Sequence, residues 1–238
     1  MIAIIMAAGK GSRLGKYTTD LPKSLLPLDK EGNTLLDYNL TILDRLGIKK
    51  ILLVTGFNSQ LLEKHIISNT NVEIIYNPFW NHCNVLGSLY MALNYIDEDF
   101  LFLHADTLAD YEIWQMLAKS NGDMVLPYEK KECGEEEMKV VLDNHDNLLD
   151  ITKEVSPEKA QGEFLGIAKF SKKTISYFKE TAEELFKAGN LNHYMESVVQ
   201  NAIQNESISI EVIDILKNKF VEVDFEEDYL RAKELFGK

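Results

Sequence analysis

Short apolar runs alternate with amphipathic segments through the first half of the chain. The apolar runs, each of strand length, are 2–6, 51–54, 72–76 and 100–103. Between them, apolar side chains recur at helical spacing in 35–46, 59–67 and 77–93. Continuous apolar runs suit strands that are buried on both faces, and strands that alternate with helices favour parallel pairing through right-handed crossovers. The pattern therefore predicts an α/β fold with a parallel sheet.

The second half has a more antiparallel character. Its short β-rich runs are 124–126, 138–142, 148–152, 163–170, 208–213 and 220–223. Two helices are expected at 172–187 and 191–205. At 238 residues, of which 45% are hydrophobic, the chain can bury one sizeable core and needs no second domain. We therefore expect a single domain over residues 1–238.

A glycine loop follows the first strand directly. Gly9 and Gly11 have no Cβ, so the loop can adopt positive φ and let an anion approach its backbone N–H groups. Arg13 offers a planar fork for phosphate oxygens, and Lys23 follows a proline that restrains its backbone. These residues predict a phosphate site, and the alternative is an ordinary βα turn with surface charges.

The loop differs from the common dinucleotide and Walker A patterns, because Gly9, Gly11 and Gly15 are spaced G-x-G-x-x-x-G and Gly15 is followed by Lys-Tyr. Instead, AAGKGSRL at 7–14 and TTDLPK at 18–23 resemble the nucleotidyltransferase family that joins NTPs to sugar phosphates and phospho-alcohols. This resemblance implies a Rossmann-like three-layer α/β/α sandwich with a mixed, mainly parallel sheet. It also implies nucleotide contacts at Ala7, Ala8, Gly9 and Gly11, and catalytic roles for Arg13 and Lys23.

Charge and cysteine content narrow the class of protein further. A net charge of −13 and a pI near 4.9 argue against partners such as nucleic acid or an anionic membrane, which require broad basic surface. The apolar start is too short for a signal peptide, and no later run is long enough for a membrane span. Cys83 and Cys133 show neither a disulfide framework nor metal-ligand spacing. We expect free thiols in the cytoplasm.

The segment from Asn77 places polar side chains in an otherwise apolar helix. Its N-x(6)-N-x(3)-S-L pattern resembles the phosphocholine, inositol-phosphate and phosphonate cytidylyltransferases of this family. In that resemblance Asn84 and Ser88 read the pyrimidine edge. The alternative is a helix N-cap with a surface serine. Trp80 can stack on a base or a cationic acceptor, or pack in the core.

Two aspartates are candidate ligands for Mg²⁺. Asp106 follows the strand 100–103, at the edge of the sheet where the glycine loop lies, and Mg²⁺ prefers a few carboxylates together with phosphate oxygens and water. The family resemblance agrees, although His104 stands where many members have an acid, and its role is left open. Asp224 lies in VEVDFEEDY, which resembles the family run whose first Asp is the second metal ligand. As alternatives, either aspartate can cap the helix that follows it.

Candidate acceptor residues come from weaker resemblances in the second half. Segments containing Lys139, Lys153 and Glu163 are similar to the M-K-V, I-S-K and G-E-x-x-G-I segments of phosphonate and phospho-alcohol members. The two lysines are candidate phosphate contacts, and Glu163 is expected to face the acceptor. In similar proteins an acidic residue of the helix at 191–205 helps to shape the acceptor site, which makes Glu196 a further candidate. Each can instead be a solvated surface residue. Trp80, Phe79 and Tyr194 are candidates for an aromatic cage around a choline-like cation.

The resemblance as a whole implies a Mg²⁺-dependent cytidylyltransferase. The nucleotide-binding half would span about 1–125 and the acceptor-binding half about 126–238. An acceptor phosphate or phosphonate oxygen, of the phosphocholine or 2-aminoethylphosphonate type, would attack the α-phosphorus of CTP in line and release pyrophosphate. A hexose-1-phosphate uridylyl- or thymidylyltransferase and a non-catalytic nucleotide-binding regulatory protein are the alternatives. The acceptor's identity and the oligomeric state stay open.

Overall fold

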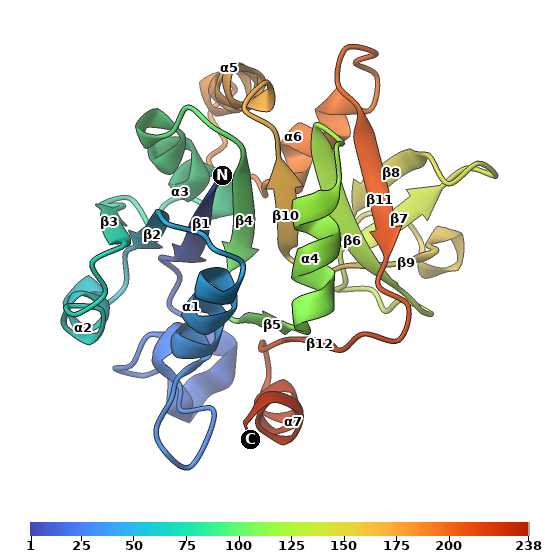
Figure 1. The fold of residues 1–238 in the computed structure, drawn as a ribbon. Coiled ribbons are helices and arrows are strands. Elements are labelled where there is room, and N and C mark those ends of the chain that lie inside the picture. Colours follow the sequence, from blue (N-terminus) through green and yellow to red (C-terminus); the bar gives the residue numbers. More distant parts are fainter. Residues whose placement is uncertain (238) are drawn as a thin grey trace.

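Residues 1–237 are described by the computed structural model, and they build a mixed sheet with helices on both faces (Figure 1). The ten strands of the sheet run β3-β2-β1-β4-β10-β6-β9-β7-β8, and β11 also pairs with β6. A separate two-stranded ribbon joins β5 and β12. The strands are β1 (Ile2–Ala7), β2 (Ile51–Thr55), β3 (Val72–Tyr76), β4 (Phe100–His104), β5 (Thr107–Ala109), β6 (Met124–Lys130), β7 (Lys139–Leu142), β8 (Leu148–Thr152), β9 (Gly162–Phe164), β10 (Ile167–Phe170), β11 (Ile210–Asp214) and β12 (Phe220–Glu222).

Seven α-helices and four short 3-10 helices connect these strands within residues 1–237. The α-helices are α1 (Leu35–Arg45), α2 (Ser59–His65), α3 (Val85–Ala92), α4 (Tyr111–Lys119), α5 (Thr174–Lys187), α6 (Glu196–Ala202) and α7 (Glu226–Phe236). The 3-10 helices are η1 (Ser12–Tyr17), η2 (Lys23–Leu25), η3 (Leu93–Tyr95) and η4 (Pro157–Lys159).

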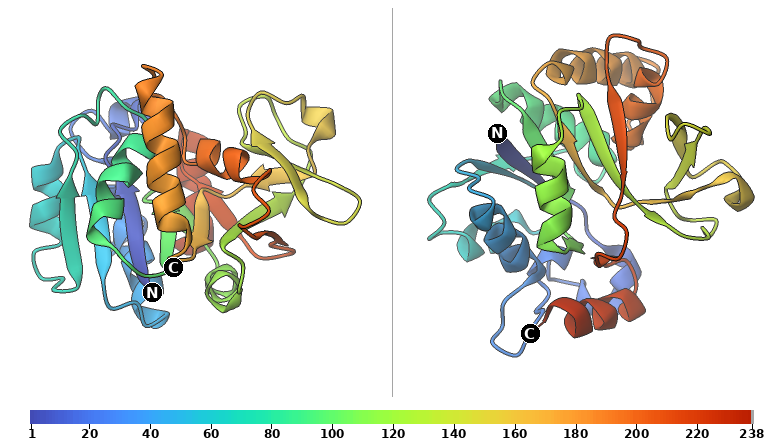
Figure 2. Two further views of the ribbon diagram at one scale, coloured as in Figure 1. Left: turned by 90° about the horizontal axis from the view of Figure 1, so that it is seen from above. Right: turned by 45° about the vertical axis from the view of Figure 1, so that its right-hand side comes forward.

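The sheet lies between two helical layers. Helices α1, α2 and α4 pack on one face through apolar residues such as Leu40, Leu62 and Trp114. Helices α3, α5 and α6 pack on the other face through residues such as Leu89 and Phe178. The predicted three-layer α/β/α sandwich is confirmed, and so is its mixed sheet: β1 to β4 pair in parallel, and β10 pairs antiparallel with β4. Beyond β6, the small β7–β8 ribbon projects away from the body of the sheet (Figure 2).

Several predicted boundaries differ from the observed ones. The run 163–170 divides into β9 and β10, because Gly166 between them has φ +70°. The helix predicted over 191–205 begins only at Glu196. The residues before it pair with the start of α3 instead: Asn84 and Leu86 donate backbone hydrogen bonds to the carbonyls of Leu191 and His193. The ribbon strand β5 was not predicted, and α3 begins eight residues after Asn77.

The C-terminal segment returns to the first half of the chain. Strand β12 pairs with β5, and α7 packs through Tyr229 and Ala232 against apolar residues that flank the glycine loop. The Tyr229 hydroxyl donates to the carbonyl of Pro27 over 2.6 Å. Residues 220–236 therefore lie beside residues 1–35, although they fall in the predicted acceptor half. Within residues 1–237, no helix has the length and apolar character needed to cross a bilayer.

Candidate active site

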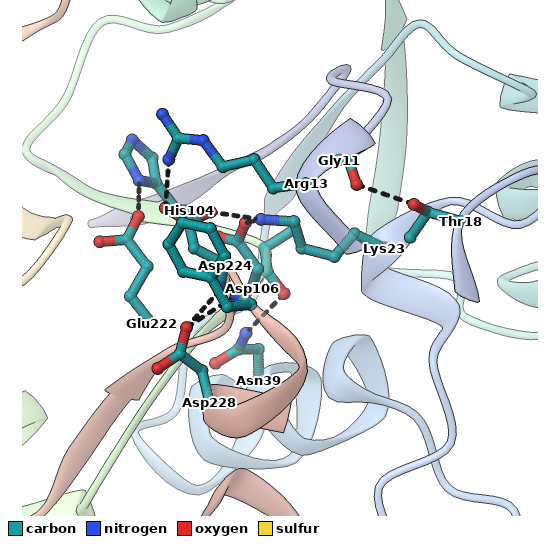
Figure 3. A network of polar contacts seen from close by, with 12 residues as sticks. Gly11, Arg13, Thr18, Lys23, Asn39, His104, Asp106, Glu222, Asp224 and Asp228 are labelled. Carbon is teal, nitrogen blue, oxygen red and sulfur yellow. Dashed lines mark hydrogen bonds and ion pairs between the residues drawn. The ribbon is translucent and has the colours of Figure 1, made fainter. Parts of the chain in front are cut away.

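The glycine loop lies at the carboxyl ends of the central strands. Met6 on β1 is the register partner of Val54 on β2 and of His104 on β4, so the loop after Ala7 emerges beside the residues that follow β4. Gly11 has φ +66°, and a Cβ there would stand 3.0 Å from Lys23 Cε. Thr18 Oγ1 donates to the Gly11 carbonyl over 2.7 Å (Figure 3). A small residue with left-handed backbone is therefore required where the loop passes Lys23.

Four predicted site residues meet in one ion-pair network (Figure 3). Lys23 Nζ lies 2.6 Å from Asp106 Oδ2 and 2.8 Å from Asp224 Oδ1. Arg13 Nη1 donates to the other Asp224 oxygen, also over 2.8 Å. The two aspartates are therefore joined by one ammonium group, although they are far apart in the sequence.

Neither aspartate caps the helix that follows it. Helix α7 is capped by Asp228, whose Oδ2 accepts from the backbone N–H groups of Asp224 and Phe225. Helix α4 is preceded by Asp110, four residues after Asp106. The helix-cap alternatives are wrong for both candidate metal ligands, because their carboxylates turn to Lys23 instead.

Burial and charge oppose each other in this network. Burial alone would lower the pKa of Lys23. The carboxylates of Asp106 and Asp224 have the larger effect and raise the pKa of Lys23 above its ordinary value. Burial also disfavours the charge of Asp224, yet Lys23 and Arg13 hold the pKa of its carboxyl below the usual range. Lys23 and Asp224 are therefore both charged at neutral pH, and the ammonium of Lys23 lies beside the glycine loop.

A cavity of ≈ 210 Å³ opens beside the glycine loop. It is lined by loop residues, by residues of the α3 segment and by the turn after β4: Met6, Ala7, Ala8, Gly9, Gly11, Lys23, Ser24, Trp80, Cys83, Asn84, Val85, Ser88, His104, Ala105 and Asp106. The residues predicted to contact the nucleotide all lie on its wall. We name it the loop cavity.

The α3 segment presents two polar residues to the loop cavity. Asn84 precedes the first turn of α3, and its Oδ1 accepts from the Val85 N–H over 2.8 Å. Asn84 is therefore the helix N-cap that the alternative interpretation predicted. Ser88 is buried, so the surface-serine alternative is wrong. Both side chains nevertheless line the cavity.

A second cavity, of ≈ 640 Å³, lies between the antiparallel part of the sheet and the start of α7. Ten acidic side chains line it against the basic side chains of Arg13, Lys131, Lys153 and Arg231. The acidic residues are Glu129, Glu135, Glu136, Glu137, Glu163, Glu196, Glu222, Asp224, Glu227 and Asp228. We name it the acidic cavity. It shares Asn84 and His104 with the loop cavity, so the two spaces meet at those residues.

Three of the four candidate acceptor residues line the acidic cavity, namely Lys153, Glu163 and Glu196. Lys139 is the exception. Its side chain is fully buried, and its ammonium donates to the backbone carbonyls of Glu135, Glu137 and Lys153. An ammonium that is held by three carbonyls away from the cavity has a structural role, which corrects the interpretation of Lys139 as a phosphate contact.

Lys131 is a residue of the acidic cavity that the sequence did not single out. It lies 2.7 Å from Glu137 and 2.8 Å from Glu163. Burial raises the pKa of Glu163 to about 6, although the hydrogen bond and charge of Lys131 oppose the shift. Lys131 lies six residues from one partner and thirty-two from the other, so only the fold reveals the contact.

His104 and two glutamates form the boundary between the cavities. His104 Nδ1 lies 3.1 Å from Glu222 Oε1 (Figure 3). Burial alone would lower the pKa of His104, but Glu222, Asp106 and Glu196 together raise it to about 9. Burial raises the pKa of Glu196. Within residues 1–237, His104 Nε2 and Glu196 Oε2 are both buried without a hydrogen-bond partner. Such atoms are costly unless a ligand or water satisfies them.

The three aromatic candidates do not line a common cavity. Trp80 lines the loop cavity and packs edge-on against Phe57, with ring centres 5.6 Å apart. Tyr194 lines the acidic cavity, where Lys153 Nζ lies 5.6 Å from its ring centre. Phe79 is 61% exposed. The predicted aromatic cage is therefore wrong as a three-residue unit.

The donor set fits a divalent cation. Asp106 and Asp224 already hold one positive charge between their carboxylates, and hard oxygen ligands suit Mg²⁺. His104, Asp106 and Glu222 form a second possible set of metal ligands, because each offers one ligand atom and these three atoms lie within 4.8 Å of one another. Imidazole is a poorer partner than oxygen for Mg²⁺, so the two-aspartate set is the better match. The sequence did not single out Glu222, although it stands two residues before Asp224.

Solved structures share the fold across the whole chain. The inositol-1-phosphate CTP transferase of T. maritima superposes with a TM-score of 0.80 over 99% of this chain and 97% of the other, at 20% identity. A putative glucose-1-phosphate thymidylyltransferase of Bacillus anthracis gives a TM-score of 0.83 over 100% and 98%, at 17% identity. At these identities the likeness establishes the fold alone.

Curated relatives and a family model complete the comparison. The CTP:phosphoglutamine cytidylyltransferase of Campylobacter jejuni is 22% identical over 96% of this chain and 97% of its own, and the choline-phosphate cytidylyltransferase of Streptococcus pneumoniae is 22% identical over 99% and 98%. The bifunctional protein GlmU of Methanococcus vannielii is 25% identical over 91% of this chain, which spans only 47% of that relative. Residues 3–174 match the model of the MobA-like NTP transferase domain. The chain therefore belongs to the MobA-like NTP transferase domain family.

Proposed function

We propose that the protein transfers CMP from CTP to a small phosphorylated or phosphonate acceptor that carries a cationic group, with Mg²⁺ and with release of pyrophosphate. The meeting of the two cavities carries this proposal. Asp106 lines the loop cavity, Asp224 lines the acidic cavity, and Lys23 joins the two carboxylates. A donor and an acceptor held in the two cavities would face each other across that network, as in-line transfer requires.

The residues of the chain act by binding and by electrostatic stabilisation. The backbone N–H groups of the glycine loop would cradle the triphosphate, and Gly11 keeps the loop against Lys23. Lys23 and Arg13 supply fixed positive charge where negative charge builds on the phosphoryl oxygens and on the departing pyrophosphate. Asp224 holds both cations near the glycine loop, so they are already placed close to where the triphosphate would bind.

Asp106 and Asp224 would hold the Mg²⁺. When bound, this ion neutralises phosphate charge and aligns the reacting groups. His104 remains beside Asp106, held by Glu222, and its raised pKa makes it a cation at neutral pH. As a cation on the wall of both cavities, His104 would add positive charge next to the acceptor phosphate.

The charge of the acidic cavity supports a cationic acceptor. Ten carboxylates surround a space that also contains Lys131 and Lys153, so the cavity favours a molecule that bears both a positive group and a phosphate. Glu196 is the best-placed partner for the positive group, because its buried Oε2 has no hydrogen-bond partner within residues 1–237. The choline-phosphate cytidylyltransferase among the relatives is named for an acceptor of this chemistry.

Pyrophosphate release tests the proposal. Each of the four NTPs would be incubated with Mg²⁺ and with phosphocholine, aminoethylphosphonate, glycerol phosphate or a hexose 1-phosphate. We expect release only with CTP and a phosphorylated or phosphonate amine. Release with UTP or dTTP and a hexose 1-phosphate would replace the proposal with a uridylyl- or thymidylyltransferase. Nucleotide binding without release across the panel would favour the regulatory alternative.

A further inference from the structure

A buried amide connects the start of α3 to the loop cavity. Asn77 is fully buried at the end of β3, and its Nδ2 donates to Ser88 Oγ over 2.8 Å and to Cys83 Sγ over 3.3 Å. Its Oδ1 accepts from the backbone N–H of Phe79 over 2.8 Å. The side chain of Asn77 does not line the cavity, but both of its hydrogen-bond acceptors do.

The backbone fixes which way this amide faces. The Phe79 N–H can only donate, so the atom of Asn77 that faces it must be the carbonyl oxygen. The NH₂ group must then face Ser88 and Cys83, and each of its two hydrogens has an acceptor. The amide orientation therefore follows from a fixed donor and from the geometry of the turn after β3.

The fixed amide leaves the proton of Ser88 free. One lone pair of Ser88 Oγ accepts from Asn77, so the hydroxyl proton is not used in that contact, and within residues 1–237 the hydroxyl donates no hydrogen bond. Ser88 lies on the wall of the loop cavity, so this O–H is available to a bound base. Ring position 3 distinguishes the two pyrimidines, since cytosine has an acceptor nitrogen there and uracil has an N–H donor. A hydroxyl that donates at that position satisfies cytosine, whereas uracil sets its own N–H against that donor unless the hydroxyl turns.

We propose that Asn77 is a positioning residue that keeps the Ser88 hydroxyl free to donate to a bound base and thereby favours cytosine over uracil in the loop cavity. This inference rests on the proposed function. Asn77 does not line the loop cavity itself and acts through Ser88, so we expect it to affect the choice of base and not the phosphate chemistry. Asn84, which also lines the cavity, has an amide that can donate to the O2 oxygen that both pyrimidines share.

The isosteric substitution N77D tests the polarity directly. The introduced carboxylate would still accept from the Phe79 N–H, but it would also accept the Ser88 proton, which leaves the Ser88 oxygen facing the cavity as an acceptor. We would measure Kd for CTP and UTP by calorimetry with Mg²⁺ at pH 7, 8 and 9, because burial raises the pKa of the introduced carboxyl and only its ionised form accepts the Ser88 proton. Binding is measured without an acceptor substrate. We expect the preference for CTP to fall about tenfold or more, with tighter binding of UTP. Tighter UTP binding is a change that mere loosening of α3 would not produce.

The matched control is N94D, which adds the same charge to exposed Asn94 in η3, directly after α3, and should keep the wild-type preference. If N77D does not fold, as judged by circular dichroism, then S88A decides: it should bind CTP about tenfold more weakly and reduce the preference. A CTP preference that is unchanged in S88A, or in folded N77D at every pH measured, would overturn the inference alone. A wild-type protein that binds neither nucleotide, or prefers UTP, would overturn the proposed function as well.

Discussion

Lys23 is the residue on which the candidate site depends most. It contacts both candidate metal ligands, and its packing against Gly11 connects the network to the glycine loop. A lysine so placed is expected to stabilise the transition state of phosphoryl transfer more than it stabilises the fold.

We predict that Lys23→Ala lowers turnover by about a hundredfold or more, because a fixed charge is lost beside the reacting phosphates. Pyrophosphate release measures this loss, and thermal unfolding shows whether the fold persists. Lys16→Ala is the matched control, since Lys16 belongs to the same loop region but is exposed and pairs with Glu226. Normal turnover in Lys23→Ala would remove Lys23 from the site.

The raised pKa of Glu163 predicts that the stability of the fold depends on pH. Its pKa is raised by burial from 4.5 to about 6, so the folded state favours the protonated form. The contribution of this proton to stability is complete below pH 4.5 and is lost as the pH rises through 6.

The substitution Glu163→Gln removes the titrating carboxyl, and with it the loss of stability as the pH rises. Relative to wild type, its free energy of unfolding should rise by up to about 2 kcal/mol between pH 4 and pH 7, as measured by urea denaturation at each pH. The control is Glu206→Gln at an exposed glutamate. A difference between Glu163→Gln and wild type that stays constant across this range would contradict the assignment.

Among the elements, the loop from β1 through η1 and η2 has the most demanding geometry. Gly11 combines a left-handed backbone with close approach to Lys23, whereas Gly47 after α1 has φ +79° and open space around it. Substitution at either position introduces similar backbone strain. Of the two, only Gly11 has a candidate catalytic residue, Lys23, as a neighbour that a new Cβ would displace.

Gly11→Ala and Gly47→Ala should therefore each lower the free energy of unfolding by about 1–2 kcal/mol. Turnover should fall more than tenfold in Gly11→Ala only, because Lys23 must move. Paired measurements of denaturant unfolding and pyrophosphate release separate these effects. Equal turnover in the two variants would show that contact with the loop does not position Lys23.

The sequence predicted the secondary structure correctly where a strong hydrophobic pattern determines it. The continuous apolar runs of β1, β2 and β4 determine buried parallel strands, and the carboxyl ends of those strands bring the glycine loop beside Asp106. The prediction failed at 191–195, where the backbone hydrogen-bonds to the start of α3 and does not form a helix. It also failed at Lys139, which the sequence does not distinguish from a surface lysine but which is fully buried. Tertiary contacts decided both cases, and a single sequence does not record them.

Across the whole molecule, the site is a junction between two parts of one sheet. The parallel part provides the loop cavity, the antiparallel part provides most of the acidic cavity, and the returning segment around β12 brings Asp224 to the boundary. The sequence indicated Asp224 through its motif. It could not show that Glu222 and Lys131 belong to the same cavity, because strand pairing and chain return place them there.

This arrangement predicts that acceptor and nucleotide binding can be altered separately. Glu196→Gln removes the buried carboxylate that faces the acidic cavity, so KM for a cationic acceptor should rise about tenfold while KM for CTP changes little. Steady-state kinetics with each substrate varied in turn measures both constants. An equal rise in the two KM values would contradict a separate acceptor cavity.

In the proposed reaction, the α-phosphorus of CTP becomes joined to an acceptor phosphate or phosphonate. Phosphorus-31 NMR of a reaction with Mg²⁺, CTP and phosphocholine or aminoethylphosphonate follows that atom directly. We predict a new diphosphate-type linkage between CMP and one of these acceptors, formed in equal amount with pyrophosphate. Formation of CDP and inorganic phosphate, or of CMP and pyrophosphate without an acceptor adduct, would contradict the proposed reaction, because water rather than an acceptor would then be the nucleophile.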